Sequence, residues 1–130
     1  MVKNKIFVVQ KHDASHLHYD FRLEIDNVLK SWAVPKIPPT EPDVKRLAIQ
    51  TEDHPLSYAD FEGTIEEGLY GAGRVELWDK GTFKPETIEE NKIVFELAGR
   101  KLQGTYVLLK LKSRGKYKGE HNWLLFKKKR

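Results

Sequence analysis

The stretch HLHYDFRLE, from His16 to Glu24, alternates polar and apolar residues without exception. Successive side chains of a β-strand point to opposite faces, so this period of two predicts a strand with an apolar and a polar face. The apolar face has an obvious use as core. A solvated polar face usually carries Thr, Ser, Lys or Glu, whereas His18 and Asp20 offer two kinds of metal ligand about 7 Å apart. The polar face therefore suggests a site rather than plain surface.

Composition limits the class of protein. The chain has 130 residues, 39% of them hydrophobic, which predicts one compact domain over residues 1–130 with a real core. The absence of cysteine excludes a disulfide framework and a thiolate zinc site, and leaves histidine and carboxylate as metal ligands. There is no apolar run of about 18 residues and no signal-peptide pattern in MVKNKIFVVQKHD. We therefore expect a cytoplasmic protein with no membrane partner.

The net charge of +4 and the pI near 9.2 point only weakly to a polyanionic partner. Much of the excess lies in KLKSRGKYKG (110–119) and in the terminal KKKR (127–130). Such runs are usually solvated, and we expect them to add at most salt-sensitive contacts to phosphates.

The remaining patterns are mostly those of strands, which we expect at 5–11, 16–25, 28–36, 46–53, 73–79, 92–99, 104–112 and 122–129. Turns are expected at Asp26–Asn27, Asp79–Gly81 and Gly99–Gly104. Short helices are expected at Tyr58–Gly68 and, as a single turn, at Thr87–Asn91. About eight short strands with regular turn signals predict an all-β fold, a small antiparallel β-barrel or a tightly folded sandwich.

Two further features have plain interpretations. Trp32, Trp78 and Trp123 are expected in the core or at the barrel rim rather than as a platform for stacking bases. The glycines of GLYGAG (68–73) predict a tight connection and not a phosphate-binding P-loop, because no Lys-Ser or Lys-Thr follows and a strand comes next.

Four of the five histidines lie before residue 55: His12, His16, His18 and His54. A short connection can fold His12, at the end of the first strand, back beside the second strand. A barrel would also give the polar face of the second strand a cavity or groove to line. A lone histidine is usually structural, but three histidines within seven residues, beside Asp20, make a metal site as reasonable an interpretation as structural histidines.

Three segments carry a resemblance: QKHDASHLHYDFRLEIDNVLKSWAVPK (10–36), EDHPLSYADFEGTI (52–65) and EGLYGAGRVELWDKGTF (67–83). In this order they resemble the 3′-phosphoesterase family, whose best-known members form the N-terminal module of bacterial DNA ligase D. The resemblance implies a small β-barrel enzyme that uses Mn²⁺ to heal DNA 3′ ends. It removes a terminal ribonucleoside and then the 3′-phosphate, and leaves a 3′-hydroxyl.

The resemblance also implies the metal ligands, which fall on His12, His18 and Asp20. Imidazole and carboxylate suit Mn²⁺, and other divalent transition metals remain open. His16 matches no ligand position and is expected to be a partly exposed polar residue. Arg22, on the same strand face, resembles the family's phosphate-binding arginine, and its planar fork matches two phosphate oxygens.

Further catalytic positions implied by the resemblance are Lys36, Arg46, His54, Tyr58, Glu52 and Gln10. The family associates the first two with the phosphomonoester, whose extra negative charge needs extra donors. A histidine and a tyrosine can donate to a phosphate oxygen, and the histidine can also protonate the leaving oxygen. Glu52 and Gln10 match positions that the family links more to the ribonucleoside-removing step.

The chain differs from ligase-borne members of the family at its two ends. Ligase-borne members have a longer arm ahead of the first strand, whereas only eleven residues precede His12 here. Removal of the 3′-phosphate is therefore the primary expectation. Polymerase and ligase modules are also missing, so we expect a stand-alone monomer that acts on primer-template 3′ ends and meets a separate ligase and polymerase in trans.

Two other function classes remain as alternatives. In a cupin-like barrel, His18, Asp20 and His54 would form the 2-His-1-carboxylate site of an Fe(II) oxygenase. Arg22, Lys36 and Arg46 would then have no role. A non-catalytic nucleic-acid-binding barrel would explain the charge and leave His12, His18 and Asp20 unexplained.

Overall fold

The computed structural model describes residues 4–66, 68, 72–112 and 119–129. Most of the basic run KLKSRGKYKG, the middle of GLYGAG and the last residue of KKKR lie outside the described residues. The described residues include no helix with the length and hydrophobicity that crossing a membrane requires.

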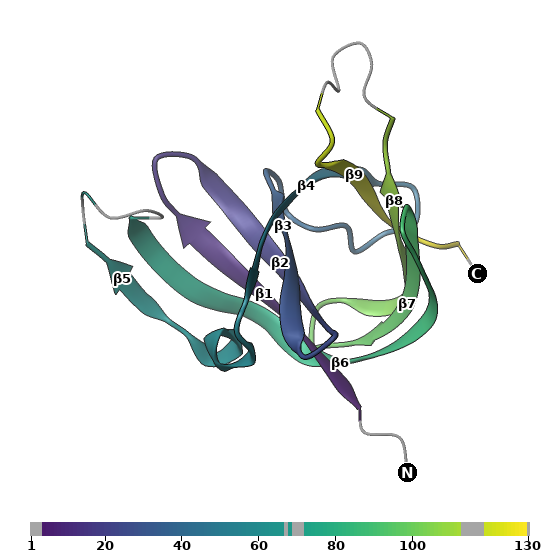
Figure 1. Ribbon diagram of the computed structural model, residues 1–130, viewed down its shortest axis with the longest axis horizontal. Helices are drawn as coiled ribbons and strands as arrows, with labels where there is room; N and C mark the ends of the chain where they lie inside the picture. Colours follow the sequence, from purple (N-terminus) through teal and green to yellow (C-terminus); the bar gives the residue numbers. More distant parts are fainter. Residues whose placement is uncertain (1–3, 67, 69–71, 113–118, 130) are drawn as a thin grey trace.

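Nine strands form one antiparallel sheet in the order β1-β2-β3-β4-β9-β8-β7-β6-β5. Pairing of β1 with β6 closes eight of these strands into a barrel, and β5 is an extra strand paired with β6. The prediction of an all-β antiparallel barrel is confirmed (Figure 1). The strands are β1 (Lys5–Asp13), β2 (Leu17–Ile25), β3 (Val28–Val34), β4 (Lys45–His54), β5 (Gly63–Ile65), β6 (Gly73–Glu89), β7 (Lys92–Ala98), β8 (Gln103–Lys110) and β9 (Asn122–Lys127).

The short helix predicted at Tyr58–Gly68 is present as a 3₁₀ helix with other bounds, η1 (Leu56–Asp60), which is followed by β5. The helical turn predicted in the second region is wrong. This region, Thr87–Asn91, is mostly the end of β6, whose partner β7 supplies the hydrogen bonds that a helix would have made internally. The turn predicted at Asp79–Gly81 is also wrong, because β6 runs through these residues. The turn between Gly99 and Gly104 is confirmed, since β7 ends at Ala98 and β8 begins at Gln103.

The alternation in β2 is confirmed. Tyr19, Phe21 and Leu23 belong to the main core inside the barrel, so the residues between them point outward. The polar face therefore lies on the outer surface of the barrel and not in its interior. Trp32 and Trp123 are buried in this core and pack edge to face, while Trp78 is partly buried against it, as expected.

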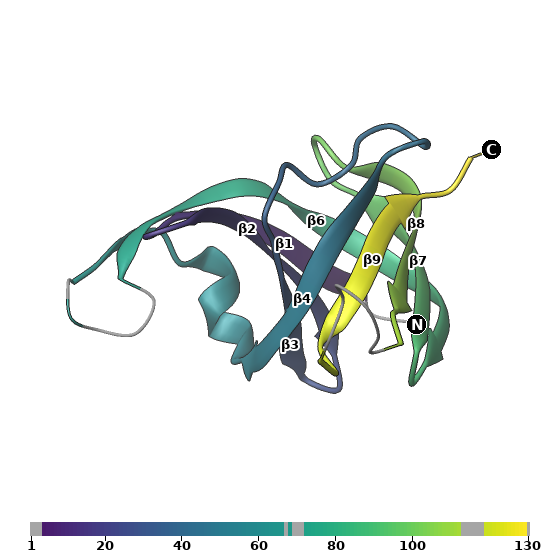
Figure 2. The same ribbon diagram turned by 90° about the horizontal axis from the view of Figure 1, so that it is seen from above.

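A second, smaller hydrophobic cluster on the outside of the barrel holds η1 against the sheet. Val8 of β1, Leu29 of β3 and Ala59 of η1 form it, with partly buried neighbours that include Leu56 and Tyr58. Figure 2 shows η1 beside the outer side of β1, β2 and β3, and Figure 1 shows β5 and the start of β6 extending away from the barrel. The polar face of β2 therefore lies on the side of the sheet that η1 covers.

The hairpin between β2 and β3 sets the register of the site. Asp26 and Asn27 both have positive φ, 55° and 65°, as a two-residue type I′ turn requires. This turn pairs Ile25 with Val28 and places Arg22 opposite Ser31. A one-residue slip would move every polar residue of β2 to the core side.

Asp79 explains why β6 continues where a turn was predicted. Its carboxylate is buried and accepts backbone N–H groups from Lys80, Arg100, Lys101 and Leu102, at 2.8–3.2 Å. Three of these donors lie in the β7–β8 turn, so the aspartate fixes that turn against β6 instead of capping a turn of its own.

We expect Asp79→Ala to lower the free energy of unfolding by about 3 kcal/mol, because several N–H groups would lose a charged acceptor in a buried place. The free energy of unfolding of Asp79→Asn should lie between those of wild type and Asp79→Ala, since the amide retains one acceptor oxygen. Urea denaturation measures this, with Glu96→Gln on the exposed side of β7 as the control, expected within about 0.5 kcal/mol of wild type. An unchanged midpoint for Asp79→Ala would contradict this role.

Candidate metal and phosphate site

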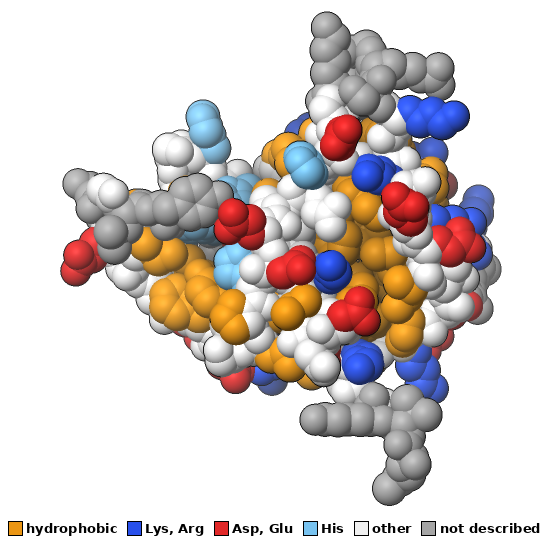
Figure 3. Space-filling model, in the orientation of Figure 1, with side chains coloured by type: hydrophobic (Ala, Val, Ile, Leu, Met, Phe, Trp, Pro, Cys, Tyr) orange, Lys and Arg blue, Asp and Glu red, His pale blue; other side chains and the backbone are white. Residues whose placement is uncertain are grey.

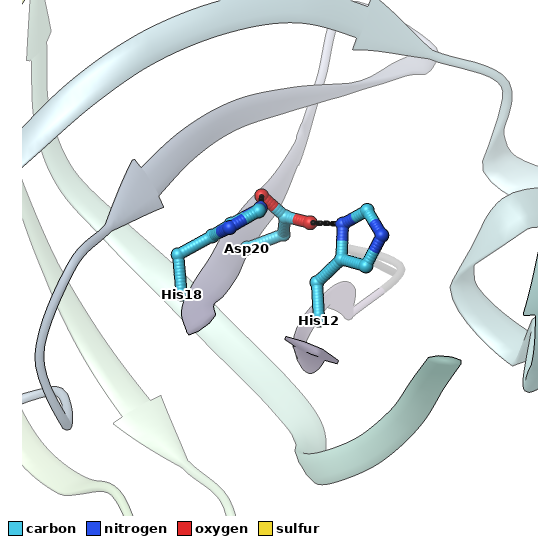
Figure 4. A group of neighbouring side chains, drawn as sticks. All are labelled: His12, His18 and Asp20. Carbon is cyan, nitrogen blue, oxygen red and sulfur yellow. Dashed lines mark ion pairs between the residues drawn. The ribbon is translucent and has the colours of Figure 1, made fainter. Parts of the chain in front are cut away.

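Two neighbouring strands bring the three predicted metal ligands together. His12 pairs with His18 across β1 and β2, and Asp20 follows two residues later on the same face. The Asp20 carboxylate lies between the rings: Oδ2 is 3.5 Å from His12 Nδ1, and Oδ1 is 3.3 Å from His18 Nε2 (Figure 4). One ligand atom from each residue lies within 4.8 Å of the others. Two imidazoles and a carboxylate in this arrangement fit a divalent transition metal.

The ring of His18 is oriented by the backbone. Its Nδ1 lies 3.0 Å from the carbonyl oxygen of His16, to which it can donate, so Nε2 is left facing Asp20. The side chain of His16 itself is exposed and is not part of the group. The hydrogen bond to Asp20 raises the pKa of His18 despite its partial burial. Burial alone would raise the pKa of Asp20, but the hydrogen bond with His18 and the charge of Arg22 outweigh it and lower that pKa.

Arg22 is a buried cation held by fixed partners. Its Nε donates to Gln10 Oε1 at 2.7 Å, its Nη1 donates to Ser31 Oγ at 2.8 Å, and its Nη2 is 3.5 Å from Asp20 Oδ2. The residue is only 3% exposed, and burial lowers its pKa. Because a buried charge is costly unless it is paired and hydrogen-bonded, these contacts are what keep the guanidinium beside the metal ligands.

His54 lies on the other side of the guanidinium. Its Nδ1 is 3.1 Å from Arg22 Nη1 and 3.0 Å from the carbonyl oxygen of Glu52. One ring nitrogen can accept from the arginine or donate to the carbonyl, but it cannot do both at once. Burial lowers the pKa of His54 and the charge of Arg22 lowers it further, so the ring is neutral at pH 7.

Tyr58 closes the site from η1. Its ring lies 5.0 Å from the guanidinium carbon of Arg22 and 4.8 Å from the ring of His54, and it stacks on Phe61. Burial raises the pKa of the Tyr58 phenol, so the hydroxyl remains a donor at neutral pH. Gln10 holds this segment in place, because its Nε2 donates to the carbonyl oxygens of Tyr58 and Phe61 at 2.8 and 3.1 Å.

These groups face a cavity of about 280 Å³. It combines anion-binding donors with metal-type ligands, and its remaining walls are small or apolar. In the space-filling view, histidine side chains gather between the projecting β5 end and the barrel (Figure 3). The lining residues are His12, His18, Asp20, Arg22, His54 and Tyr58, together with Ala14, Ala33, Thr51 and Ile65.

Four predicted residues do not line this cavity. Lys36 and Arg46 line a separate surface pocket of about 240 Å³ with Lys45, and Arg46 Nε donates to the carbonyl oxygen of Ile37 at 2.8 Å. Glu52 is exposed and lines a neighbouring cavity, and its backbone carbonyl oxygen contacts His54. Gln10 is fully buried behind Arg22 and does not line the cavity.

Ser31 was missed from the sequence, although a signal for it exists. Its hydroxyl accepts from Arg22 and donates to the carbonyl oxygen of Leu29 at 3.0 Å. A two-residue turn at Asp26–Asn27 places position 31 opposite position 22, so the register of the hairpin points to Ser31 as the neighbour of Arg22.

Comparisons with known proteins identify the family of this chain. A family model described as the DNA ligase D 3′-phosphoesterase domain matches residues 10–110. The multifunctional non-homologous end joining protein LigD of Pseudomonas aeruginosa is 55% identical over 128 residues, which is 95% of this chain and 15% of the relative. The LigD proteins of Mycobacterium tuberculosis and Mycolicibacterium smegmatis are 50% and 41% identical over 80% and 97% of this chain, and 14% and 17% of their own length.

The family match covers the end of β1 that carries His12, all of β2, and the segment that carries His54 and Tyr58. The chain spans about 15% of the length of the first of these relatives, so the resemblance concerns one domain of a much longer protein. On the matched residues, the chain belongs to the DNA ligase D 3′-phosphoesterase domain family.

Proposed function

We propose that this chain is a Mn²⁺-dependent phosphoesterase that heals DNA 3′ ends. It removes a 3′-phosphate, and also a 3′-terminal ribonucleoside, to leave a 3′-hydroxyl. The observation that carries the proposal is the single cavity in which His12, His18 and Asp20 face a buried arginine. Family membership and the names of the relatives support a role in DNA end repair.

Each residue of the cavity has a role that follows from the chemistry of its side chain. Arg22 binds phosphate oxygens and stabilises the charge that develops on them, because Gln10 and Ser31 already hold its other donors in place. Tyr58 donates to the same phosphate. Neutral His54 holds a proton at one ring nitrogen and can pass it to the leaving oxygen. His12, His18 and Asp20 would hold a divalent ion, which would supply Lewis-acid chemistry beside the phosphate.

The substrates and partners of this chain belong to the proposal. A healed 3′-hydroxyl is what a polymerase or ligase requires, so we propose that such enzymes use the product, in trans, in cytoplasmic end joining. The protein is proposed to act as a monomer on primer-template ends that carry a 3′-phosphate or a terminal ribonucleotide. The names of the relatives, which refer to non-homologous end joining, support this setting.

The geometry is less favourable to an oxygenase. An Fe(II) site made of His18, Asp20 and His54 would need the last ring beside the carboxylate, whereas His54 contacts Arg22 and His12 completes the group of ligand atoms. A buried cation in the cavity suits an anionic substrate.

A 5′-labelled primer with a 3′-phosphate tests the proposal, incubated with Mn²⁺, with Fe²⁺ and oxygen, or with a chelator. We expect conversion to a 3′-hydroxyl with Mn²⁺ and none with the chelator. Binding of the primer without conversion in any metal would instead identify a binding module, and oxygen consumption with Fe²⁺ but no phosphate release would identify an oxygenase.

Arg46→Ala should cause a 3′-phosphate to accumulate on a ribonucleotide-ended primer. A phosphomonoester carries more charge than a diester, so the positive charge of Lys36 and Arg46, which line a separate pocket, should attract the phosphate-ended primer and matter more for the second step, by about tenfold. Products of a 5′-labelled primer on a denaturing gel measure this, with Lys84→Ala on β6 as the control. Equal loss of both steps, with no phosphate-ended intermediate, would show that the charge argument is wrong.

Mn²⁺ affinity should fall as the pH is lowered through the raised pKa of His18. Metal binding requires the neutral imidazole, so below that pKa a proton competes and affinity falls about tenfold per pH unit. Without metal, the same shift stabilises the fold fully below pH 6.5 and the effect is lost as the pH rises through the raised pKa. Calorimetric titrations at pH 6 and pH 8 test this, and equal affinities would contradict it.

A further inference from the structure

A second cavity shares a wall with the first. It has a volume of about 630 Å³, and Thr51 of β4 lines both cavities. The two cavities therefore adjoin at Thr51, and together they are called the groove. The lining residues of the second cavity are Gln50, Thr51, Glu52, Asp53 and His121.

His121, like His16, is a histidine that the proposed chemistry does not use. It precedes β9, and its carbonyl oxygen accepts the backbone N–H of Gln50 at 2.7 Å. This hydrogen bond fixes residue 121 beside β4 although 71 positions separate the two residues. The imidazole is exposed at the edge of the groove.

The second cavity is more acidic than the first, in which Arg22 lies beside Asp20. Two carboxylates line the second cavity, and none of its described lining residues is a lysine or an arginine. One of these carboxylates is paired, because Lys30 Nζ lies 3.4 Å from Asp53 Oδ2 in a partly exposed pair. Phosphate would be repelled here, whereas neutral groups with hydroxyl or amine donors would find acceptors.

We infer that this second cavity binds the 3′-terminal ribonucleoside that leaves in the first step, a role that rests on the proposed function. With the scissile phosphate beside Arg22, the terminal nucleoside carries no further phosphate and extends from the first cavity as a neutral group. Its two ribose hydroxyls are donors, and carboxylates recognise ribose hydroxyls in nucleotide-binding proteins. The volume is in the range of small-molecule sites, and imidazole is among the rings on which bases stack.

The reaction is consistent with this placement. Hydrolysis of the diester adds the oxygen of water to phosphorus, breaks the bond between phosphorus and the 5′ oxygen of the nucleoside, and leaves a proton on that oxygen. The phosphate stays on the primer in the first cavity. Asp53 and His121 therefore serve the first step only, because a 3′-phosphate primer has nothing to place in the second cavity.

The double variant Asp53→Asn/His121→Ala tests the inference. On a primer with one 3′-terminal ribonucleotide, we expect kcat/KM to fall at least about tenfold, mainly through KM, because lost binding of the leaving nucleoside acts on both ground and transition states. On a 3′-phosphate primer, kcat/KM should stay within about twofold of wild type. Glu96→Gln removes one negative charge on β7, away from the groove, and should leave both steps unchanged.

Free adenosine is a second probe that does not depend on turnover. It should shift the His121 ring resonances of the wild-type protein, and 2′-deoxyadenosine should bind more weakly. Wild-type rates on the ribonucleotide primer, or equal loss of both steps, in the double variant would overturn the inference while the proposed function stands. If the wild type acts on neither primer, the proposed function fails, and adenosine binding that the double variant loses would still support the cavity, whereas no binding would overturn it.

Discussion

Replacing Asp20 by alanine is expected to lower 3′-phosphate removal by at least about 10³-fold. The carboxylate lies between His12 and His18, and its Oδ2 also faces Arg22. Its loss would therefore remove one metal ligand and leave the other two, together with a buried guanidinium, without their shared partner. Release of inorganic phosphate from a 3′-phosphate primer at ordinary Mn²⁺ measures the effect.

His12→Ala and His18→Ala should act in the same direction, because each removes one of only two imidazoles. His16→Ala is the matched control: its ring is exposed and it supports His18 through the backbone carbonyl, which alanine retains. Circular dichroism should show a folded barrel in every variant, since the side chains lie outside the main core. Robust turnover by Asp20→Ala would contradict the assignment of the metal ligands.

Removal of Arg22 should be the second largest effect. Arg22→Ala takes a charged donor from a water-poor phosphate site, which costs on the order of 10²–10³ in rate on both the diester and the monoester. Arg22→Lys should not restore activity. The native guanidinium uses separate nitrogens for Gln10, Ser31 and the cavity, whereas lysine has one nitrogen and would leave Gln10 Oε1 buried without a donor.

Ser31→Ala provides a graded comparison for this prediction. It removes one of the hydrogen bonds that hold Arg22 and should cost less than Arg22→Ala, with a fall in kcat rather than a rise in KM if the arginine is misplaced in the transition state. Steady-state kinetics on the 3′-phosphate primer separate the two parameters. Wild-type rates in Arg22→Lys would show that a single positive charge suffices and that the separate donors of the planar guanidinium have no role.

The alternation of HLHYDFRLE predicts the strand, and the Asp26–Asn27 turn predicts its pairing with β3, because both depend on local geometry. The same alternation does not say what lies over the polar face. That depends on η1, a single 3₁₀ segment without periodicity, which packs on the outer side of β1 and β3 through Ala59. The helix predicted at 58–68 begins after the start of η1 and extends over β5, so it does not describe this arrangement.

Asp79-Lys80-Gly81 shows the opposite case, in which a strong local signal is overruled by distant contacts. The aspartate binds the β7–β8 turn, and the glycine leaves no side chain where the carbonyl of Ala98 passes close by. Residue types typical of a turn serve here to pack one strand against another hairpin. Local propensity cannot separate these uses, because both need a small residue beside a hydrogen-bonding carboxylate.

The candidate site was predictable where residues share a strand face, as His18, Asp20 and Arg22 do. The position of Gln10 behind the arginine, and of Arg46 in a separate pocket, depends on how strands and loops meet across the barrel. Sequence motifs report that such residues belong to one family pattern, but they do not distinguish a group that faces the cavity from one that supports it.

One titration tests the central claim most directly, namely that phosphate release depends on a metal held by His12, His18 and Asp20. Free Mn²⁺ is followed by electron paramagnetic resonance while phosphate release from a 3′-phosphate primer is measured on the same samples. We predict that one Mn²⁺ binds per chain with activity rising in parallel, and that Asp20→Ala loses both. Full activity in the presence of a chelator, or unchanged Mn²⁺ binding by Asp20→Ala, would contradict it.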